Sequence, residues 1–180
     1  MTERQLIAAC KKQDRRAQQL LYDRYSPQMF GVCRRYIKER DAAEDVLVDG
    51  FFKILTNLEK YSGTGSFEGW IRRIIINQSL MHLRKHKNKY MHAELGEHLE
   101  TETKLSIEDD LAENDVLKFL DYLPPGYRTI FNLYVIEGYK HREIAELLGI
   151  SINTSKSQLI LAKKRMRQLL ISANYPGLLG

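Results

Sequence analysis

The sequence has few of the residues that build covalent or metal-linked scaffolds. Its two cysteines, Cys10 and Cys33, form no Cys-x-x-Cys pair. This spacing disfavours a disulfide framework or a zinc site and is typical of a protein kept in a reducing compartment. No stretch approaches the roughly 18 uncharged residues of a membrane span, and the start of the chain lacks the apolar core of a signal peptide. The sequence therefore predicts a cytoplasmic protein that is neither exported nor inserted into a membrane.

The net charge is small, but it is unevenly distributed. The chain carries +5, from 28 Lys and Arg against 23 Asp and Glu. From Glu94 to Asp115, nine acidic residues accompany one basic residue. Two basic bodies thus flank an acidic middle, a pattern often found in nucleic-acid binders with a solvated or regulatory segment.

Apolar residues recur at helical spacing along most of the chain, and no alternating run is long enough to indicate a strand. The predicted fold class is therefore all-α. Side chains that can cap helices, or a proline suited to a first turn, mark where helices should begin. The expected starts are Thr2 with Gln5, Asp14, Ser26-Pro27, Asp41 with Glu44, and Ser66.

Two small helical domains are expected, because the helical pattern weakens once along the chain. The first should span residues 1–90 and the second residues 107–175. Between them, residues 91–106 are mostly polar and include several acidic side chains, which favours a flexible acidic linker. Within the second domain, Leu123-Pro-Pro-Gly126 should interrupt the helices and Gly138 should introduce a pause.

The stretch from His141 to Leu159 is typical of a helix–turn–helix. Ile144, Ala145 and Leu148 give its first helix an inward face, Gly149 can end that helix in a left-handed conformation, and Ser151 can cap the next. The second helix would then enter the major groove of DNA with its first turns and meet phosphates further along. A plain helical hairpin with a solvated polar face is the alternative. The candidate DNA-binding residues are Asn153, Thr154, Ser155, Lys156, Ser157, Gln158, Lys163 and Lys164.

The first domain carries a second candidate nucleic-acid surface. A glycine-containing loop, Tyr61 to Ser66, precedes a helix that should run to about His86 and become strongly basic. Basic grooves with aromatic or amide groups hold unstacked single-stranded DNA. We interpret Phe67 and Trp70 as core residues, and we place Ile76 and Leu80 away from the Trp70 stripe. The candidate contacts are Tyr61, Ser62, Arg72, Arg73, Asn77, Arg84 and Lys85.

Several motifs together resemble the extracytoplasmic-function (ECF) subgroup of the sigma-70 family of bacterial RNA polymerase sigma factors. They are residues 41–52, 67–77, 123–128, 137–145 and 154–159. The resemblance implies a non-enzymatic factor without a cofactor or metal, which binds core RNA polymerase and directs it to promoter DNA. Residues 41–52 would dock on the polymerase through Asp45, Asp49 and Phe52. The first domain would trap a flipped base of the -10 element, the second would read the -35 element, and an anti-sigma factor is an expected partner.

Two other functions fit parts of the pattern. A free-standing helix-turn-helix regulator would bind a palindrome as a dimer without polymerase. An enzyme could use His82 and His86, spaced i and i+4, as metal ligands with Glu94 or His98. The surrounding Lys and Arg residues would repel a cation, and no third ligand has a fixed spacing, so the sigma-factor interpretation is favoured.

Overall fold

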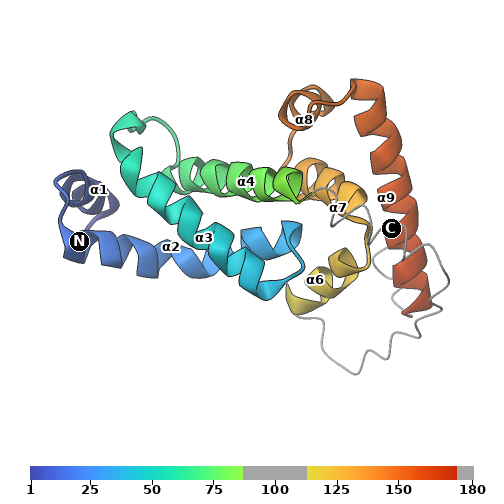
Figure 1. Ribbon diagram of the computed structural model, residues 1–180, viewed down its shortest axis with the longest axis horizontal. Helices are drawn as coiled ribbons and strands as arrows, with labels where there is room; N and C mark the ends of the chain where they lie inside the picture. The colour runs from blue at the N-terminus through green and yellow to red at the C-terminus, as the bar shows by residue number, and fades with distance from the viewer. Residues whose placement is uncertain (87–112, 174–180) are drawn as a thin grey trace. The chain divides into compact units, whose positions relative to one another are not determined.

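The computed structural model describes residues 1–86 and 113–173, and all regular structure in these two ranges is helical (Figure 1). The predicted all-α class is therefore confirmed. Contacts divide the chain into two compact units, Met1–Lys85 and His86–Gly180. The predicted linker, residues 91–106, lies outside the described residues, as do Glu94 and His98.

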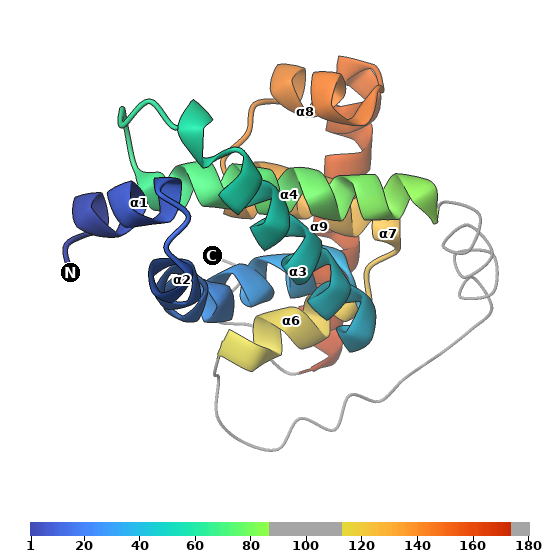
Figure 2. The ribbon, with the colours of Figure 1, turned by 60° about the vertical axis from the view of Figure 1, so that its left-hand side comes forward.

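The first unit is a bundle of four α-helices and one 3₁₀ turn. Its elements are α1 (Glu3–Lys11), α2 (Arg15–Tyr36), α3 (Arg40–Thr56), the 3₁₀ turn η1 (Leu58–Lys60) and α4 (Phe67–Lys85). Helices α2, α3 and α4 all pack against one another, while α1 packs on α2 (Figure 2). Their apolar faces meet in a core of fully buried side chains, among them Met29, Ile54, Phe67 and Ile75.

Three of the predicted helix starts are confirmed by their cap hydrogen bonds. Thr2 Oγ1 accepts from the N–H of Gln5, while the Gln5 side chain accepts from the N–H of Thr2 at 2.9 Å. Asp14 Oδ1 accepts from the N–H of Ala17 at 3.1 Å. Ser66 Oγ accepts from the N–H of Gly69 at 3.2 Å, so α4 begins where predicted.

The predicted break at Ser26-Pro27 is wrong, because α2 runs through Pro27 without interruption. Proline inside a helix removes one hydrogen bond and costs about 3 kcal/mol. Apolar side chains on both sides of Pro27 nevertheless continue one buried face, with Leu21 and Tyr25 before it and Met29 and Val32 after it. We attribute the unbroken helix to the packing of this face.

The predicted capping box at Asp41 is also wrong. Helix α3 begins at Arg40 after an extended Glu39 that makes no side-chain cap. Asp41 therefore lies in the first turn, where a carboxylate still stabilises the helix dipole. Glu44 pairs instead with Arg40, whose Nε lies 2.9 Å from Glu44 Oε1.

Helix α4 buries more of its surface than the sequence indicated. Ile76 and Leu80, which were placed away from the core stripe, are only 1% and 2% exposed. They join Phe67, Ile71 and Ile75 in the bundle because α4 packs against both α2 and α3. The expectation that Ile76 and Leu80 lie on an outer face is corrected accordingly.

The second unit places a helix–turn–helix on a small helical base. Its described elements are α6 (Glu113–Asp121), α7 (Pro125–Phe131), the π turn η2 (Asn132–Ile136), α8 (His141–Leu148) and α9 (Ile152–Ser172). Phe119, Leu120 and Leu123 pack with Leu169 of α9 in a buried cluster. The interruption predicted at Leu123 to Gly126 is confirmed, since α7 starts at Pro125.

A buried arginine closes the end of α6. Arg128 is 4% exposed, and its guanidinium donates to the carbonyl oxygens of Leu120 at 2.7 Å, Asp121 at 3.0 Å and Leu123 at 3.3 Å. Asp121 Oδ1 lies 3.7 Å from Arg128 Nη1. Carbonyls at the end of a helix lack partners further along it, so this side chain, together with the N–H of Leu123 that donates to the carbonyl oxygen of Leu120 at 3.1 Å, stabilises the last turn of α6 and ties it to α7.

Both cysteines lie in the interior of the first unit and are free thiols. Cys10 is 2% exposed and Cys33 is 0% exposed. Burial raises the pKa of Cys33 to about 12, while burial followed by the negative charge of Asp14 raises the pKa of Cys10. Both side chains therefore act as small apolar core groups.

Candidate nucleic-acid and protein interfaces

The helix–turn–helix has the geometry that its sequence predicts. Gly149 ends α8 with a φ of +66°, the left-handed conformation that favours glycine. Ser151 Oγ accepts from the N–H of Thr154 at 3.0 Å and so caps α9. Ile144 of α8 and Ala162 of α9 are both 0% exposed where the two helices pack. Helix α8 lies against the N-terminal part of α9 (Figure 1).

Most of the predicted DNA-binding residues of α9 lie on its outer surface. Asn153, Lys156, Ser157, Lys163 and Lys164 are exposed, whereas Thr154 and Gln158 are half-buried. Arg165 and Arg167 are exposed further along the same helix. The described part of α9 thus combines polar side chains in its first turns with a basic second half, an arrangement suited to base and phosphate contacts respectively.

Ser155 differs from its neighbours and requires a correction. Its side chain is 0% exposed, and its Oγ lies 2.9 Å from Nδ1 of His141. Ser155 precedes the buried residues Leu159 and Ala162 by four and seven positions, which places it on the inner face of the helix. It joins α8 to α9 rather than lying on the surface that could meet DNA. The helical spacing contained this signal, but the sequence interpretation grouped Ser155 with the exposed first turns.

The loop before α4 is held by an aromatic cluster. Tyr61 donates its hydroxyl hydrogen to the carbonyl oxygen of Gly65 at 3.0 Å, across a loop in which Gly63 and Gly65 both have positive φ. The rings of Tyr61 and Phe67 lie 5.0 Å apart, and those of Phe67 and Trp70 lie 5.8 Å apart. Phe67 is a core residue as predicted, but Trp70 is half-buried. Ser62 is exposed at the loop tip, with its Oγ 2.7 Å from Thr64 Oγ1.

Helix α4 brings most of the predicted polar contacts to one exposed side. Arg73, Asn77 and Arg84 follow one another at spacings of four and seven residues and are all exposed, as is Lys85. Met81, which was not among the predicted contacts, lies among them and is 50% exposed. Arg72 is half-buried, with its Nη2 3.8 Å from Glu68 Oε1. The result is a basic strip with an amide and an exposed thioether, next to the Tyr61 loop.

Helix α3 presents a mixed acidic and apolar face. Asp45, Asp49 and Phe52 are exposed and lie at spacings of four and three residues. Val48 falls on the same side and is 58% exposed, while Phe52 is 71% exposed. Large apolar side chains that are this exposed and grouped mark interaction surfaces. We call Asp45, Val48, Asp49 and Phe52 the α3 face.

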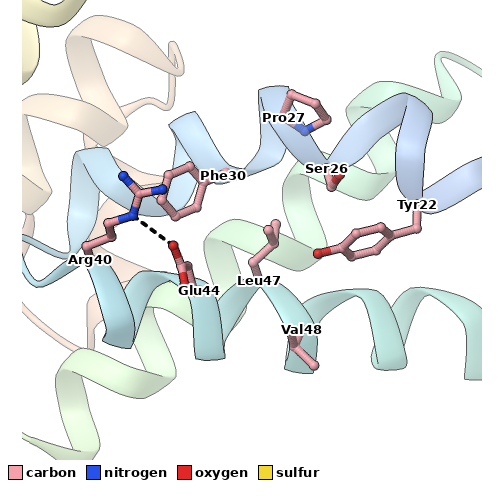
Figure 3. Close-up of a pocket in the computed structure, with 8 residues that line it drawn as sticks. All are labelled: Tyr22, Ser26, Pro27, Phe30, Arg40, Glu44, Leu47 and Val48. Atoms are coloured by element: carbon pink, nitrogen blue, oxygen red, sulfur yellow. Dashed lines mark hydrogen bonds and ion pairs between the residues drawn. The ribbon is translucent and has the colours of Figure 1, made fainter.

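A hollow of about 320 Å³ adjoins the α3 face, between α2 and α3 (Figure 3). At one end the guanidinium of Arg40 lies 5.6 Å from the centre of the Phe30 ring and pairs with Glu44. Val48 belongs to both the hollow and the α3 face. Sequence reasoning missed the hollow because it forms only where two helices meet. The lining residues are Tyr22, Ser26, Pro27, Phe30, Arg40, Glu44, Leu47 and Val48.

Two features of the described residues concern metal sites and membrane spans. Within residues 1–86 and 113–173, no three His, Cys, Asp or Glu side chains are grouped as a metal site would require. None of the described helices combines the length and apolar character needed to cross a bilayer.

These features define an all-helical protein of two units, the second of which contains a helix–turn–helix. Residues 21–89 match the family Sigma-70 region 2, and residues 113–166 match the family Sigma-70, region 4. The chain belongs to the sigma-70 family of RNA polymerase sigma factors, in the ECF subgroup. The predicted sigma-factor function is thereby confirmed over the free-standing regulator.

Relatives with similar sequences cover most of the chain. It is 33% identical to the RNA polymerase sigma factor SigV of Bacillus subtilis over 139 residues, which cover 77% of this chain and 81% of the relative. It is 27% identical to the ECF RNA polymerase sigma-E factor of Haemophilus influenzae over 177 residues, which cover 91% and 93%.

Two solved structures share the fold. One is CnrH in complex with the cytosolic domain of CnrY, with a TM-score of 0.53, 22% identity, and coverage of 94% of this chain and 97% of that one. The other is the sigma factor RpoE in complex with the anti-sigma factor NepR from Bartonella quintana, with a TM-score of 0.54, 20% identity, and coverage of 84% and 95%.

Proposed function

We propose that this chain works in the cytoplasm as a promoter-specificity factor whose separate surfaces carry separate tasks. The α3 face binds core RNA polymerase. The exposed strip of α4, made by Arg73, Asn77, Met81, Arg84 and Lys85, receives the -10 element together with the Tyr61 loop. Helix α9 reads the -35 element. The observation that carries the proposal is the placement of an exposed acidic and apolar face on α3 in the same unit as the exposed basic strip of α4. The functional domains are residues 1–90 and 107–175, with residues 91–106 as linker.

The -10 surface is supported by the chemistry around the Tyr61 loop. A base leaving the duplex loses stacking and pairing, and aromatic and amide groups replace those interactions. The half-buried ring of Tyr61 begins this loop and contacts the half-buried ring of Trp70, while Asn77 offers an amide almost three turns into α4. Arg73, Arg84 and Lys85 supply positive charge along the same helix for the phosphates.

An anti-sigma factor is a further proposed partner. The solved relatives CnrH and RpoE were each captured in a complex with another protein, and for RpoE that protein is an anti-sigma factor. The exposed α3 face offers such a partner an apolar surface. A protein that covered this face would prevent the chain from binding polymerase, so occupation by one partner should exclude the other.

Promoter opening is expected to require core polymerase. Two small DNA-reading units joined by a linker cannot fix their own spacing, so the chain alone should bind promoter DNA weakly. Gel-shift assays and permanganate footprinting, each with and without core enzyme, measure binding and strand opening. Core enzyme without the chain is the matched control. Tight, specific binding and strand opening by the chain alone would contradict the proposal.

Gln158 and Lys164 should separate base reading from phosphate contact in α9. An amide can make a bidentate contact with adenine, so Gln158→Ala should cost about 1–3 kcal/mol on the preferred -35 sequence and relax the preference at one position. Lys164→Ala should weaken binding to all sequences alike. The slope of the logarithm of the binding constant against the logarithm of the salt concentration should become smaller in magnitude by about one. Dissociation constants for a duplex selected from a random pool, measured at several salt concentrations, test both. Unchanged base preference in Gln158→Ala would remove it from the reading surface, and an unchanged salt slope would remove Lys164 from the phosphate contacts.

A further inference from the structure

Three side chains behind the exposed face of α9 form a cluster that the assigned interfaces do not use. They are Tyr134 in the π turn, His141 at the start of α8, and Ser155 on α9. The ring centroids of Tyr134 and His141 lie 4.5 Å apart with 25° between their planes, and His141 Nδ1 lies 2.9 Å from Ser155 Oγ. Three elements of the helix–turn–helix region therefore meet at one imidazole ring.

The π turn fixes the Tyr134 side of this cluster. The N–H of Glu137 donates to the carbonyl oxygen of Asn132, five residues earlier, at 2.9 Å. Asn132 and Leu133 are both 0% exposed, which anchors the turn in the core. Gly138, with a φ of +77°, then lets the chain turn before α8. Since π turns are frequent at functional sites, the placement of Tyr134 against His141 calls for a function.

The charges around His141 come mainly from the proposed DNA-binding face. Burial lowers the pKa of His141, and the positive charges of Lys156 and Lys163 lower it further. These lysines are seven residues apart on α9, and Lys163 Nζ also lies 5.8 Å from the centre of the Tyr134 ring. On α8 itself, Glu143 accepts from the N–H of Lys140 at 2.7 Å, and Arg142 pairs with Glu146 at 3.5 Å.

We propose that His141 is a positioning residue that orients α9 on DNA and takes up a proton when DNA binds. The inference rests on the proposed function of α9, because the phosphates of the bound DNA supply the negative charge. Phosphates beside Lys156 and Lys163 offset the positive field at the ring, and that change favours the imidazolium. The bond to Ser155 survives protonation, since a charged ring donates at Nδ1 where a neutral ring can accept. Binding therefore tightens as the pH falls.

The test is the pH dependence of DNA binding by the full chain. Dissociation constants for the selected -35 duplex are measured from pH 8 to pH 6 at fixed low ionic strength. If DNA binding raises the pKa of His141 by one unit, the affinity for the duplex increases by up to about tenfold between pH 8 and pH 6. His141→Gln keeps an amide that can bond to Ser155 but takes up no proton, so it should match the parent at pH 8 and show little tightening. His141→Ala, which loses the bond as well, should bind more weakly at every pH.

Two controls assign the effect to this residue. His82→Gln, on α4 of the first unit, should retain the parental pH dependence. A proton NMR titration of the His141 ring should give a higher pKa with the duplex than without it, a change that a purely structural residue would not show. Parental pH dependence in His141→Gln, or an equal ring pKa in the free and bound states, would overturn proton uptake. Parental affinity of His141→Ala at pH 8 would overturn the positioning role.

The same binding assay separates this inference from the proposed function. If Lys164→Ala and Gln158→Ala both bind every duplex as the parent does, the DNA-reading function of α9 fails. If those variants are impaired while His141→Gln keeps the parental pH dependence, the proposed function stands and proton uptake by His141 is overturned.

Discussion

Replacing Phe52 by alanine is expected to weaken binding to core RNA polymerase about thirtyfold, the loss of about 2 kcal/mol typical of an aromatic anchor at the centre of an interface. The ring is 71% exposed in the free chain, so its removal leaves no cavity. Alanine also has the higher helix propensity, and α3 should remain folded. Competition between labelled parent and unlabelled variant for core enzyme gives the affinity, and circular dichroism gives the helix content.

A matched control distinguishes a specific contact from general loss of apolar surface. Leu20 lies on α2 in the same unit and is 39% exposed, but it belongs neither to the α3 face nor to the hollow. Leu20→Ala should bind core enzyme as the parent does. Asp49→Lys, which reverses a charge beside Phe52, should weaken binding and leave the helix folded. Parental affinity in both Phe52→Ala and Asp49→Lys would show that polymerase binds elsewhere.

Replacing Arg128 by methionine is expected to lower the free energy of unfolding of the second unit by about 3–5 kcal/mol, the range for disrupting a buried ion pair by removing one partner. Methionine retains apolar volume but leaves the carbonyl oxygens of Leu120, Asp121 and Leu123 without this donor. Buried carbonyl oxygens that lose a charged hydrogen-bond donor carry a desolvation cost, even though that of Leu120 keeps the N–H of Leu123. The α6–α7 junction should therefore lose most of its protection.

Hydrogen exchange on the full chain measures this loss unit by unit. Amides of α6 and α7 should exchange faster in Arg128→Met, while those of α2 and α4 in the other unit serve as an internal reference. Arg142→Ala is the control substitution, because the Arg142 side chain is 83% exposed in its pair with Glu146 and such pairs contribute little. Equal protection of α6 in the parent and Arg128→Met would show that the buried contacts add no net stability.

The sequence allowed good predictions wherever a local interaction decides the structure. Thr2, Asp14, Ser66 and Ser151 cap helices as predicted because each cap bond spans only three residues. Gly149 is similar, since its left-handed conformation follows from the absence of a Cβ. Lys156 and Lys163, predicted as DNA contacts from the helix–turn–helix motif, are both exposed.

Prediction failed where packing between helices outweighed local preference. Local preferences place a helix start at Ser26-Pro27. They do not account for the buried apolar face that continues on both sides of this pair. Ile76 and Leu80 were misplaced because α4 contacts two helices rather than one. The contact between His141 and Ser155 joins residues 14 positions apart, which no single-helix pattern reports.

The burial of both thiols has a consequence for oxidative signals. Oxidation and disulfide exchange proceed through the thiolate, and burial, which raises the pKa of Cys33 to about 12, keeps that thiol protonated at neutral pH. Cys10 is shielded in the same way, and these two are the only cysteines in the sequence. While the first unit stays folded, its thiols are poor targets for peroxide or glutathione. An oxidative signal that reaches this factor must therefore arrive through a partner or through other side chains.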